Sequence, residues 1–422
     1  MKPIKIAHMK KIKGRNCLWF LLAFSMACNN TEDKSKTATE NVDSTKSQKS
    51  YAHDREFLKK NTKNIIELQS ADSNAKILLS ADYQGRVMTS TAKGDSGTSF
   101  GWINYNLISS AEKKKQFNPY GGEERFWLGP EGGQYSLYFK KGDSFNIAHW
   151  QVPAIIDTVM YDVVQPDNAK AVFSRKASLV NYSGTHFDID IERKISLLDK
   201  KQIEERLKIN IPSSIHFVGY ETSNSIKNIG TTNWKKENGL LSIWLLGMMT
   251  PSEQTTVIIP FIPQKNIHDF ITDNYFGQIP AERLQIKDSV LFFMCDGKSR
   301  GKIGLSPVIA KSIAASYDFK NNVLSIIFFP VEKNGMYVNS KWELQKQPFK
   351  GDVVNSYNDG PLQDGTQLGP FYEIESSSSV KELKIGEKQE YIQTTCHLQG
   401  DFNALNMIAK QLLDVDLNEI KK

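Results

Sequence analysis

Most of the chain after residue 70 alternates between short apolar runs and clusters of turn-forming residues. In the run 187–197, Phe187, Ile189 and Ile191 alternate with polar residues, as in a half-buried β-strand. Asn-Gly, Asp-Gly and similar pairs separate the runs and are typical of β-hairpins. Together these patterns predict strands within 75–91, 134–139, 170–174, 187–197, 203–211, 257–262, 323–329 and 371–375.

Helical spacing occurs only near the two ends of this region. Residues 54–68 predict one short helix, and residues 401–420 predict another that Asp401 would cap. The roughly 370 residues from 51 to 422 exceed a minimal domain and contain no linker or repeat, so two domains or one large sandwich are expected. We predict the second arrangement, a mostly β fold: a large antiparallel β-supersandwich with short terminal helices.

The N-terminus has the order of a bacterial lipoprotein signal. A basic start precedes the apolar stretch 16–27, which ends in a small residue before Cys28. That stretch is shorter than the ~20 apolar residues of a membrane-spanning helix, although an uncleaved anchor or a buried helix is the alternative. We expect residues 1–27 to be removed and Cys28 to carry lipid, holding the protein on a cell envelope membrane at its periplasmic or surface face.

The segment that follows Cys28 is polar. Residues 29–50 contain a single large apolar side chain, Val42, and cannot bury enough surface to offset the entropy of ordering. We expect residues 28–50 to be a disordered tether between the lipid and a domain that spans 51–422.

Removal of the signal also changes the charge. The whole chain has 53 Lys and Arg against 47 Asp and Glu, and six of the basic residues lie in 1–27. The remaining 47 basic and 47 acidic residues cancel, so no general electrostatic attraction to nucleic acid is expected.

Two cysteines remain besides Cys17 and Cys28. Cys295 and Cys396 lie in apolar or strand-like surroundings, which favours two separate buried thiols, with a disulfide as the alternative in an exported protein. No Cys-x-x-Cys pair or Cys/His cluster indicates zinc.

The densest candidate site is the segment 118–133, NPYGGEERFWLGPEGG. Its glycines and prolines argue against a helix or a regular strand and allow close approach of a ligand. Glu123, Glu124, Arg125 and Trp127 offer hydrogen bonds to hydroxyls and an apolar platform, as a sugar pocket requires. The alternative is a tight structural corner held by an Arg–Glu pair.

A second cluster lies between residues 355 and 387. Tyr357 and Asn358 are expected at a loop tip, where they could contact a ligand. Glu373 and Glu375 alternate along a strand and therefore share one face. Two neighbouring carboxylates repel, which raises the pKa of one of them and suits acid–base chemistry. A solvated strand face is the plainer interpretation.

Other polar groups are weaker candidates. Asn228 suits a turn or hydroxyl recognition, and His149 beside Trp150 is more often structural than a catalytic base. The basic turn 296–302 is interpreted as an exposed hairpin, with phosphate or sulfate binding as the alternative.

These motifs together resemble the galactose-mutarotase-like superfamily over roughly residues 65–400. Residues 374–377, followed by Leu-Lys-Ile-Gly-Glu at 383–387, are similar to the superfamily's Leu-Glu-Thr-Gln and later Leu-x-Pro-Gly-Glu. The stretch 121–127 is similar to the Gly-Gly segment that lines the sugar site in relatives. The whole signature GGEERFWLGPEGG resembles that of an uncharacterised group of secreted lipoproteins.

The resemblance implies roles for particular residues. Glu375 corresponds to the catalytic base, and Asn228 to the Asn of a Thr-Asn-His segment whose His is the general acid. Here Ile229 follows Asn228, so the acid is missing, and His149 or His186 would have to replace it from another strand. The superfamily resemblance implies no cofactor, although clustered carboxylates in a cleft would also suit calcium.

Three functions follow as hypotheses. The first is an exported lipoprotein that binds or modifies a carbohydrate, with a pocket built from Arg125, Glu124, Trp127, Asn228 and Glu375. The second is an enzyme, either an aldose 1-epimerase with Glu375 as base or a glycosidase that pairs Glu124 with Glu375. The third is a structural or assembly lipoprotein with a degenerate pocket.

Overall fold

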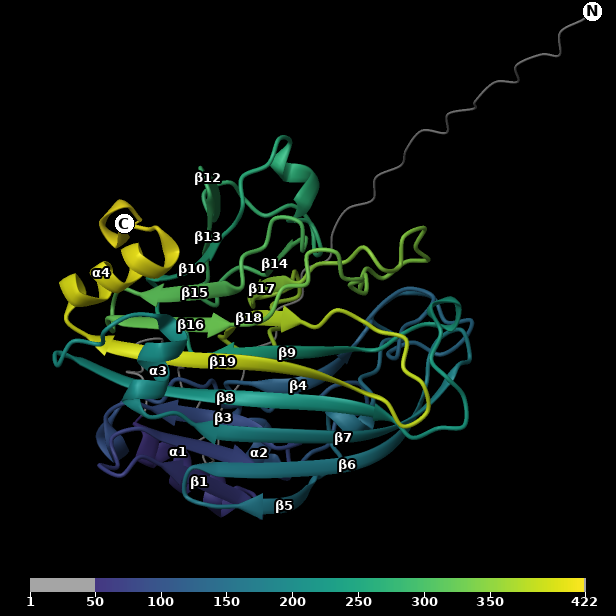
Figure 1. Cartoon of the computed structure of the whole chain (residues 1–422), viewed down its shortest axis with the longest axis horizontal. Helices are drawn as coiled ribbons and strands as arrows, with labels where there is room; N and C mark the ends of the chain where they lie inside the picture. The colour runs from purple at the N-terminus through teal and green to yellow at the C-terminus, as the bar shows by residue number, and fades with distance from the viewer. Residues whose placement is uncertain (1–49, 421–422) are drawn as a thin grey trace, which may run out of the picture. The chain divides into compact units, whose positions relative to one another are not determined.

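The computed structural model describes residues 50–420, and these residues form three antiparallel sheets (Figure 1). The largest sheet has ten strands, and its long central strands β7 and β8 pair over nine residues. In spatial order it contains β12 (Leu284–Lys287), β13 (Val290–Met294), β10 (Thr255–Pro260), β15 (Ile313–Asp318), β16 (Val323–Phe328), β19 (Lys388–Gly400), β8 (Ile215–Asn228), β7 (His186–Leu197), β6 (Lys170–Val180) and β5 (Asp162–Pro166).

The second sheet has six strands and the third has three. The six-stranded sheet contains, in order, β11 (Ile271–Thr272), β14 (Gly301–Leu305), β17 (Val354–Asn358), β18 (Tyr372–Ser377), β9 (Ser242–Met249) and β4 (Arg125–Gly129). The small sheet contains β1 (Ile65–Gln69), β2 (Lys76–Ser80) and β3 (Arg86–Thr91), and a bridge from Val87 to Glu124 connects it to the segment before β4.

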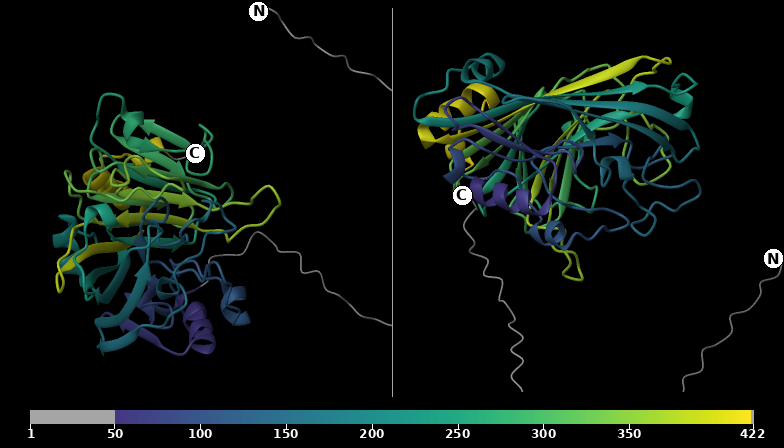
Figure 2. Two further views of the ribbon diagram at one scale, coloured as in Figure 1. Left: turned by 90° about the vertical axis from the view of Figure 1, so that its right-hand side faces the viewer. Right: turned by 90° about the horizontal axis from the view of Figure 1, so that it is seen from below.

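The two larger sheets lie face to face and enclose the main core (Figure 2). Phe126 of β4 and Ile374 of β18 point inward and join one buried cluster with Ile191 and Ile226 of the ten-stranded sheet. The neighbours of these residues, Arg125 and Glu373, must then point to the opposite face, because side chains alternate along a strand. That outer face of the six-stranded sheet carries the candidate site described below.

Four α-helices occur in the described residues: α1 (Tyr51–Asn61), α2 (Tyr105–Ser110), α3 (Lys200–Leu207) and α4 (Phe402–Leu413). Ile203 of α3 and Leu405 of α4 belong to a second buried cluster with Ile258, Leu324 and Leu398, so these two helices cover the other face of the ten-stranded sheet. The 3-10 turns are Gly94–Ser96, Ala154–Ile156, Lys236–Asn238, Ile267–Phe270 and Leu417–Glu419.

The fold class is confirmed: the molecule is a large, mostly antiparallel β-sandwich with short helices at both ends. Asp401 caps α4 by accepting a hydrogen bond from the Ala404 amide, as predicted. Several local predictions are wrong. Residues 203–211 lie largely in α3, which a reciprocal Asp199–Gln202 capping box begins.

Other elements also differ from prediction. Residues 134–139 form turns rather than a strand. The first helix ends at Asn61, and the rest of its predicted length enters β1. The glycine-rich segment contains the regular strand β4, because Arg125–Gly129 pairs with β9 along its whole length.

The two described cysteines match the favoured prediction. Cys295 and Cys396 are free and buried, and no disulfide joins them. The predicted signal, Cys28 and nearly all of the tether lie outside the described residues. Within residues 50–420, no helix is both long and apolar enough to cross a bilayer.

Candidate functional site

A cleft of about 1090 Å³ opens on the outer face of the six-stranded sheet. Its floor comes from alternate residues of five strands, and its walls come from the loops around residues 114–119, 131–150, 274–276, 338–343 and 359–371. The floor residues that matter most are Arg125 and Trp127 of β4, Trp244 of β9, Glu373 of β18, Tyr357 of β17 and Lys302 of β14.

Strand register brings Arg125 to the two carboxylates of β18. Leu246 of β9 pairs with Arg125 on one side and with Glu375 on the other, so these three residues form one row across the sheet. The Arg125 guanidinium donates to the Glu373 carboxylate. Its Nε and Nη1 groups have no protein partner among the described residues. These two buried donors lie beside the floor of the cleft without a protein acceptor in residues 50–420.

Glu375 points to the same face as Glu373, as the alternation along β18 predicts. Its Oε2 accepts hydrogen bonds from Lys302 Nζ at 2.9 Å and from Trp244 Nε1 at 3.0 Å. The side chain is completely buried, whereas Lys302 and Trp244 line the cleft above it. Glu375 thus lies immediately below the floor of the cleft and supports two residues that face a ligand.

Glu131 enters the cleft from the Gly-Pro-Glu-Gly-Gly part of the signature. Its backbone amide donates to Ser340 Oγ at 3.2 Å. Gly132 packs so closely on this neighbouring loop that an added Cβ would lie 2.3 Å from the Lys341 carbonyl oxygen. The glycine therefore permits the close packing that fixes Glu131 at the wall.

Aromatic rings form much of the remaining wall. The Trp127 and Trp244 rings meet edge to face at 5.5 Å, and the Trp150 and Trp342 rings stack at 5.9 Å. Phe117 contacts Trp127 and Trp150 and connects the two pairs. Flat apolar surfaces thus stand beside the charged floor, a combination that suits a ligand with both apolar faces and hydroxyl groups.

The ionisable groups of the floor affect one another's pKa. Burial raises the pKa of Glu131 to about 7, and the nearby charge of Glu375 adds to this effect while Lys302 opposes it. Burial also raises the pKa of Glu373, against the opposing charge of Arg125. For Lys302, burial lowers the pKa, but the carboxylates Glu375, Glu131 and Glu373 outweigh it and raise the pKa overall.

Of the predicted site residues, Arg125, Trp127, Glu373 and Tyr357 line the cleft, and Glu375 lies directly beneath it. Glu123 and Glu124 lie elsewhere, inside the sandwich. Glu124 accepts hydrogen bonds from Arg193 and Gln393 of the ten-stranded sheet, and Glu123 bonds with His397 at 2.8 Å. Glu124 precedes Arg125 by one position and so faces the opposite side of the strand, where it cannot form a glycosidase pair with Glu375.

Three more predicted residues lie outside the cleft. Asn228 is buried at the end of β8, where its side chain bonds to the backbone of Thr232 and Leu383. Asn358 ends β17 and binds the Gly297 amide and the Ser299 carbonyl, which fixes the neighbouring turn. His149 is exposed and bonds to the Ser144 carbonyl. No histidine within residues 50–420, His186 included, lines this cleft.

Sequence reasoning missed Lys302, Glu131 and Trp244 as parts of the site. Lys302 belongs to the segment interpreted as an exposed basic turn, but β14 begins at Gly301 and points Lys302 into the cleft, toward Glu375. Glu131 lies inside the quoted signature, and its position between Gly-Pro and Gly-Gly was a usable signal. Trp244 lies in the apolar run 240–249, and only the pairing of β9 between β4 and β18 reveals its polar partner.

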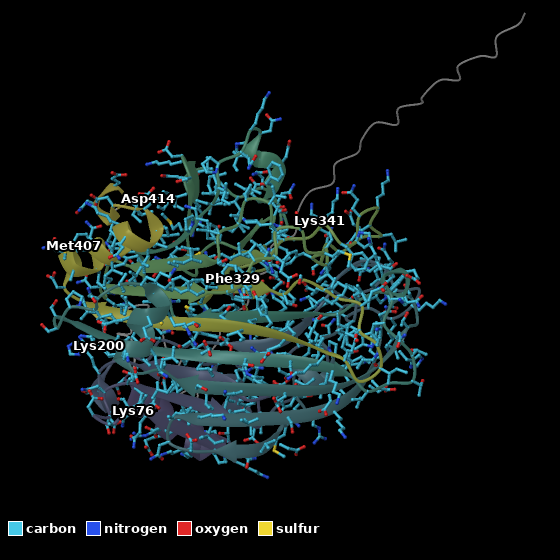
Figure 3. The ribbon with its side chains drawn as sticks, in the orientation of Figure 1. Lys76, Lys200, Phe329, Lys341, Met407 and Asp414 are labelled. Atoms are coloured by element: carbon cyan, nitrogen blue, oxygen red, sulfur yellow. The ribbon has the colours of Figure 1, made fainter. Side chains whose placement is uncertain are left out.

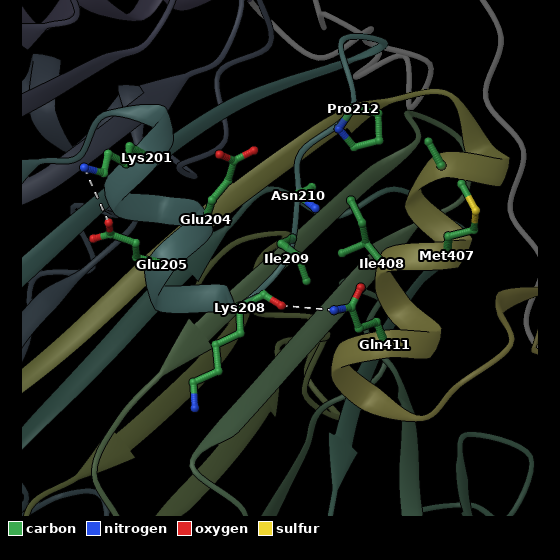
Figure 4. A pocket seen from close by; sticks show the side chains of 11 residues that line it. Lys201, Glu204, Glu205, Lys208, Ile209, Asn210, Pro212, Met407, Ile408 and Gln411 are labelled. Carbon is green, nitrogen blue, oxygen red and sulfur yellow. Dashed lines mark hydrogen bonds and ion pairs between the residues drawn. The ribbon is translucent and has the colours of Figure 1, made fainter.

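A second hollow, of about 510 Å³, lies between α3 and α4 (Figure 4). Some of its charged residues form ion pairs within α3, such as Lys201 with Glu205. Gln411 of α4 donates a hydrogen bond to the Lys208 carbonyl at the end of α3. It lacks the aromatic walls and buried charges of the first cleft. Nowhere in residues 50–420 does a group of three or more His, Cys, Asp or Glu side chains form a metal site.

Comparison with known proteins gives a family. Residues 49–422 match the model described as a family of unknown function, DUF6786. No curated protein matches the chain.

Solved structures that resemble the chain carry titles of the predicted superfamily. One is a galactose mutarotase-like protein from Lactobacillus casei ATCC 334, with a TM-score of 0.47 and 9% identity, covering 79% of this chain and 100% of that one. Another is an aldose epimerase homologue from C. elegans, with a TM-score of 0.47 and 12% identity, covering 80% of this chain and 99% of that one.

Proposed function

This chain belongs to the DUF6786 family, whose function is unknown, and we propose from the geometry of the cleft that it binds a carbohydrate there. The observation that carries the proposal is the convergence of aromatic rings with buried charged groups on one strand face. Trp127, Trp150 and Trp244 offer flat apolar surfaces to the C–H faces of a sugar, while Arg125 and Glu131 offer hydrogen-bonding groups to its hydroxyls.

The state of Glu375 favours binding over catalysis by that residue. A general base must reach the proton that it removes, whereas Glu375 is fully buried and held by Lys302 and Trp244. Its role is then to fix the ammonium and the indole that the ligand meets. The charged and aromatic lining also argues against a degenerate pocket in a purely structural lipoprotein.

A carbohydrate-modifying enzyme is the second candidate, and one observation favours it. Glu131, Glu373 and Glu375 supply three carboxylates, against the two cations Arg125 and Lys302, so one carboxyl group tends to keep a proton near neutral pH. Glu131, with its pKa near 7 and its place on the wall, is then a proton donor of the kind that mutarotation needs.

We also propose that the protein is exported and that lipid on Cys28 anchors it to a cell envelope membrane. The order of basic, apolar and small residues before Cys28 supports this proposal. Labelled fatty acid should be incorporated into the expressed protein, and Cys28→Ser should abolish the label and release the protein from membranes. Equal labelling of the variant would contradict the proposal.

A carbohydrate screen tests the proposed binding directly. The purified protein should be applied to a glycan array, and hits should be measured by calorimetry with Trp127→Ala and Arg125→Ala beside the wild type. Trp234→Phe is the matched control, because Trp234 is buried away from the cleft beside Phe187. We expect both cleft variants to weaken binding at least about tenfold and the control to retain it. Absence of binding to every saccharide would overturn the proposal.

A further inference from the structure

We infer that the carbohydrate carries acidic groups, an inference that rests on the proposed function. Four cationic side chains lie around the mouth of the cleft, and they come from three separate segments. Lys114 and Lys115 lie on one loop, Arg300 precedes β14, and Lys341 lies on the loop that packs against Gly132. Such a ring differs from the floor, where each cation has a carboxylate partner.

The cations at the mouth are not consumed by ion pairs within the protein. In residues 50–420, the ion pairs near the cleft are Arg125 with Glu373 and Lys302 with Glu375, and none of the four mouth cations forms one. Arg300 instead lies 4.0 Å from the centre of the Phe276 ring, which is exposed beside it. Arg300 also acts electrostatically on Asp359, and Lys341 acts on Asp352. Lys114 and Lys115 are therefore the mouth cations whose charge is most available to a ligand.

Most acidic residues of the lining are, by contrast, buried and hydrogen-bonded, and burial raises the pKa of Asp352 and Asp359 as it does that of Glu131 and Glu373. Asp352 accepts a hydrogen bond from the Tyr275 hydroxyl at 2.6 Å. Asp359 accepts from the Tyr357 hydroxyl at 2.5 Å and from the Gly369 amide at 3.0 Å. Glu373 is paired with Arg125, and burial favours the protonated form of Glu131. Glu343 is the remaining acidic residue of the lining, and it is exposed.

The lining contains six basic and five acidic residues, so its excess of positive charge is small and lies at the mouth. Without the six basic residues of the predicted signal, the chain has equal numbers of basic and acidic residues, so the mouth does not reflect a basic protein. Cations without partners around a cleft attract anionic ligands and raise their association rate. The cleft also exceeds the usual range of about 300–1,000 Å³ for small-molecule pockets, which suits an oligosaccharide rather than one sugar.

Carboxylate groups of uronic acids and sulfate groups share the chemistry that these cations would recognise. The test therefore uses two matched pairs of probes. The first pair is an oligogalacturonide and its methyl ester, which differ only in the charge of the carboxyl groups. The second pair is a dextran oligosaccharide with and without sulfate. Binding to the purified protein is measured by calorimetry in low salt and again in 0.5 M NaCl.

We expect the acidic member of at least one pair to bind about tenfold more tightly than its neutral partner in low salt, and high salt to remove most of this preference. The double variant Lys114→Ala/Lys115→Ala should weaken binding of the acidic probe about fivefold or more but leave the neutral probe within about twofold. The matched control is Lys200→Ala/Lys201→Ala on α3, because Figure 3 places Lys200 away from Lys341. It should change neither.

Two results would overturn the inference while the proposed function stands: equal affinity for both members of each pair, or no effect of the double variant on the acidic probe. If neither an acidic nor a neutral saccharide binds, the proposed function itself fails. The inference would also be overturned if a single-stranded oligonucleotide of the same charge displaced the acidic probe equally well, because charge alone would then explain the binding. A melting curve of each variant confirms that it is folded.

Discussion

Lys302 of β14 reaches past β17 to place its ammonium 2.9 Å from the fully buried carboxylate of Glu375 on β18, and the same ammonium lies 4.9 Å from the centre of the Trp244 ring. This contact connects three strands below the cleft. Because both charges are largely removed from water, burial of either one is costly unless the other charge lies beside it. The pair therefore fixes the positions of Lys302 and Trp244, the two groups through which Glu375 can affect a ligand.

Loss of one member of this pair should destabilise the fold more than loss of both. Lys302→Met leaves the Glu375 charge buried without its cation, and we expect a loss of about 3–5 kcal/mol in the free energy of unfolding. Lys302→Met/Glu375→Gln should recover part of it. Urea unfolding of the two single variants and the double variant measures the coupling. Strictly additive losses would show that the two residues do not depend on each other.

The ionisation of Glu131 should contribute to the pH dependence of the free energy of unfolding. A carboxyl group whose pKa in the folded protein lies above its unfolded value stabilises the fold when protonated. That contribution is complete below the unfolded pKa of 4.5 and is lost as the pH rises through about 7. Between about pH 5 and pH 8, the free energy of unfolding should therefore fall less in Glu131→Gln than in the wild type.

The matched control for this experiment is Glu343→Gln, which removes an exposed carboxylate of the same cleft. Its pH profile should follow that of the wild type. If Glu131→Gln and Glu343→Gln have the same profile, the ionisation of Glu131 makes no special contribution to stability.

Substitution of Glu124 should affect mainly the stability of the fold, whereas substitution of Glu373 should affect mainly ligand affinity. Glu124 bonds with Arg193 and Gln393 inside the sandwich, whereas Glu373 lines the cleft. We expect Glu124→Ala to destabilise the fold by a few kcal/mol, roughly 3–5, because it leaves the Arg193 charge buried without a carboxylate, although Arg193 still donates to Asn224 and Gly85. Affinity for a saccharide found in the screen should stay unchanged. Glu373→Gln should lower that affinity, and reduced binding in Glu124→Ala at a temperature where it is folded would contradict the assignment.

Both buried thiols should be unreactive in the folded protein. Burial raises the pKa of Cys396 to about 12 and that of Cys295 further, so little thiolate forms at neutral pH. A thiol reagent should modify neither residue in buffer and both in guanidinium chloride. Rapid modification of Cys295 or Cys396 without denaturant would show that one of them is accessible.

Local patterns predicted those parts of the fold in which one face of an element is buried. Alternation along 371–375 correctly gave Glu373 and Glu375 a common face, and the spacing in 401–420 gave α4 with its cap. The same reasoning failed at 203–211, where alternating apolar residues concealed a helix that starts from a capping box. A capping box forms between a few neighbouring residues, and the Asp-x-x-Gln at 199–202 was its signal.

The candidate site was predictable only in part, because it depends on which strands become neighbours. The segment 121–127 contains both a core carboxylate, Glu124, and a cleft cation, Arg125, at adjacent positions. Gly121 and Gly122, with φ of 94° and 111°, bend the chain before β4. Composition alone therefore could not show which residues of this segment face the core and which face the cleft. Lys302 joins the site through a strand order that no local pattern contains.

The central claim, that a carbohydrate occupies the cleft on the outer face of the six-stranded sheet, can be tested by the indole signals of the protein. In an NMR spectrum of protein labelled with ¹⁵N-tryptophan, titration with a saccharide from the screen should shift the signals of Trp127, Trp150, Trp244 and Trp342, which line the cleft. The signal of Trp234, packed against Phe187, should remain in place. Saturable binding that leaves the four cleft signals unmoved, or that shifts Trp234 instead, would contradict the claim.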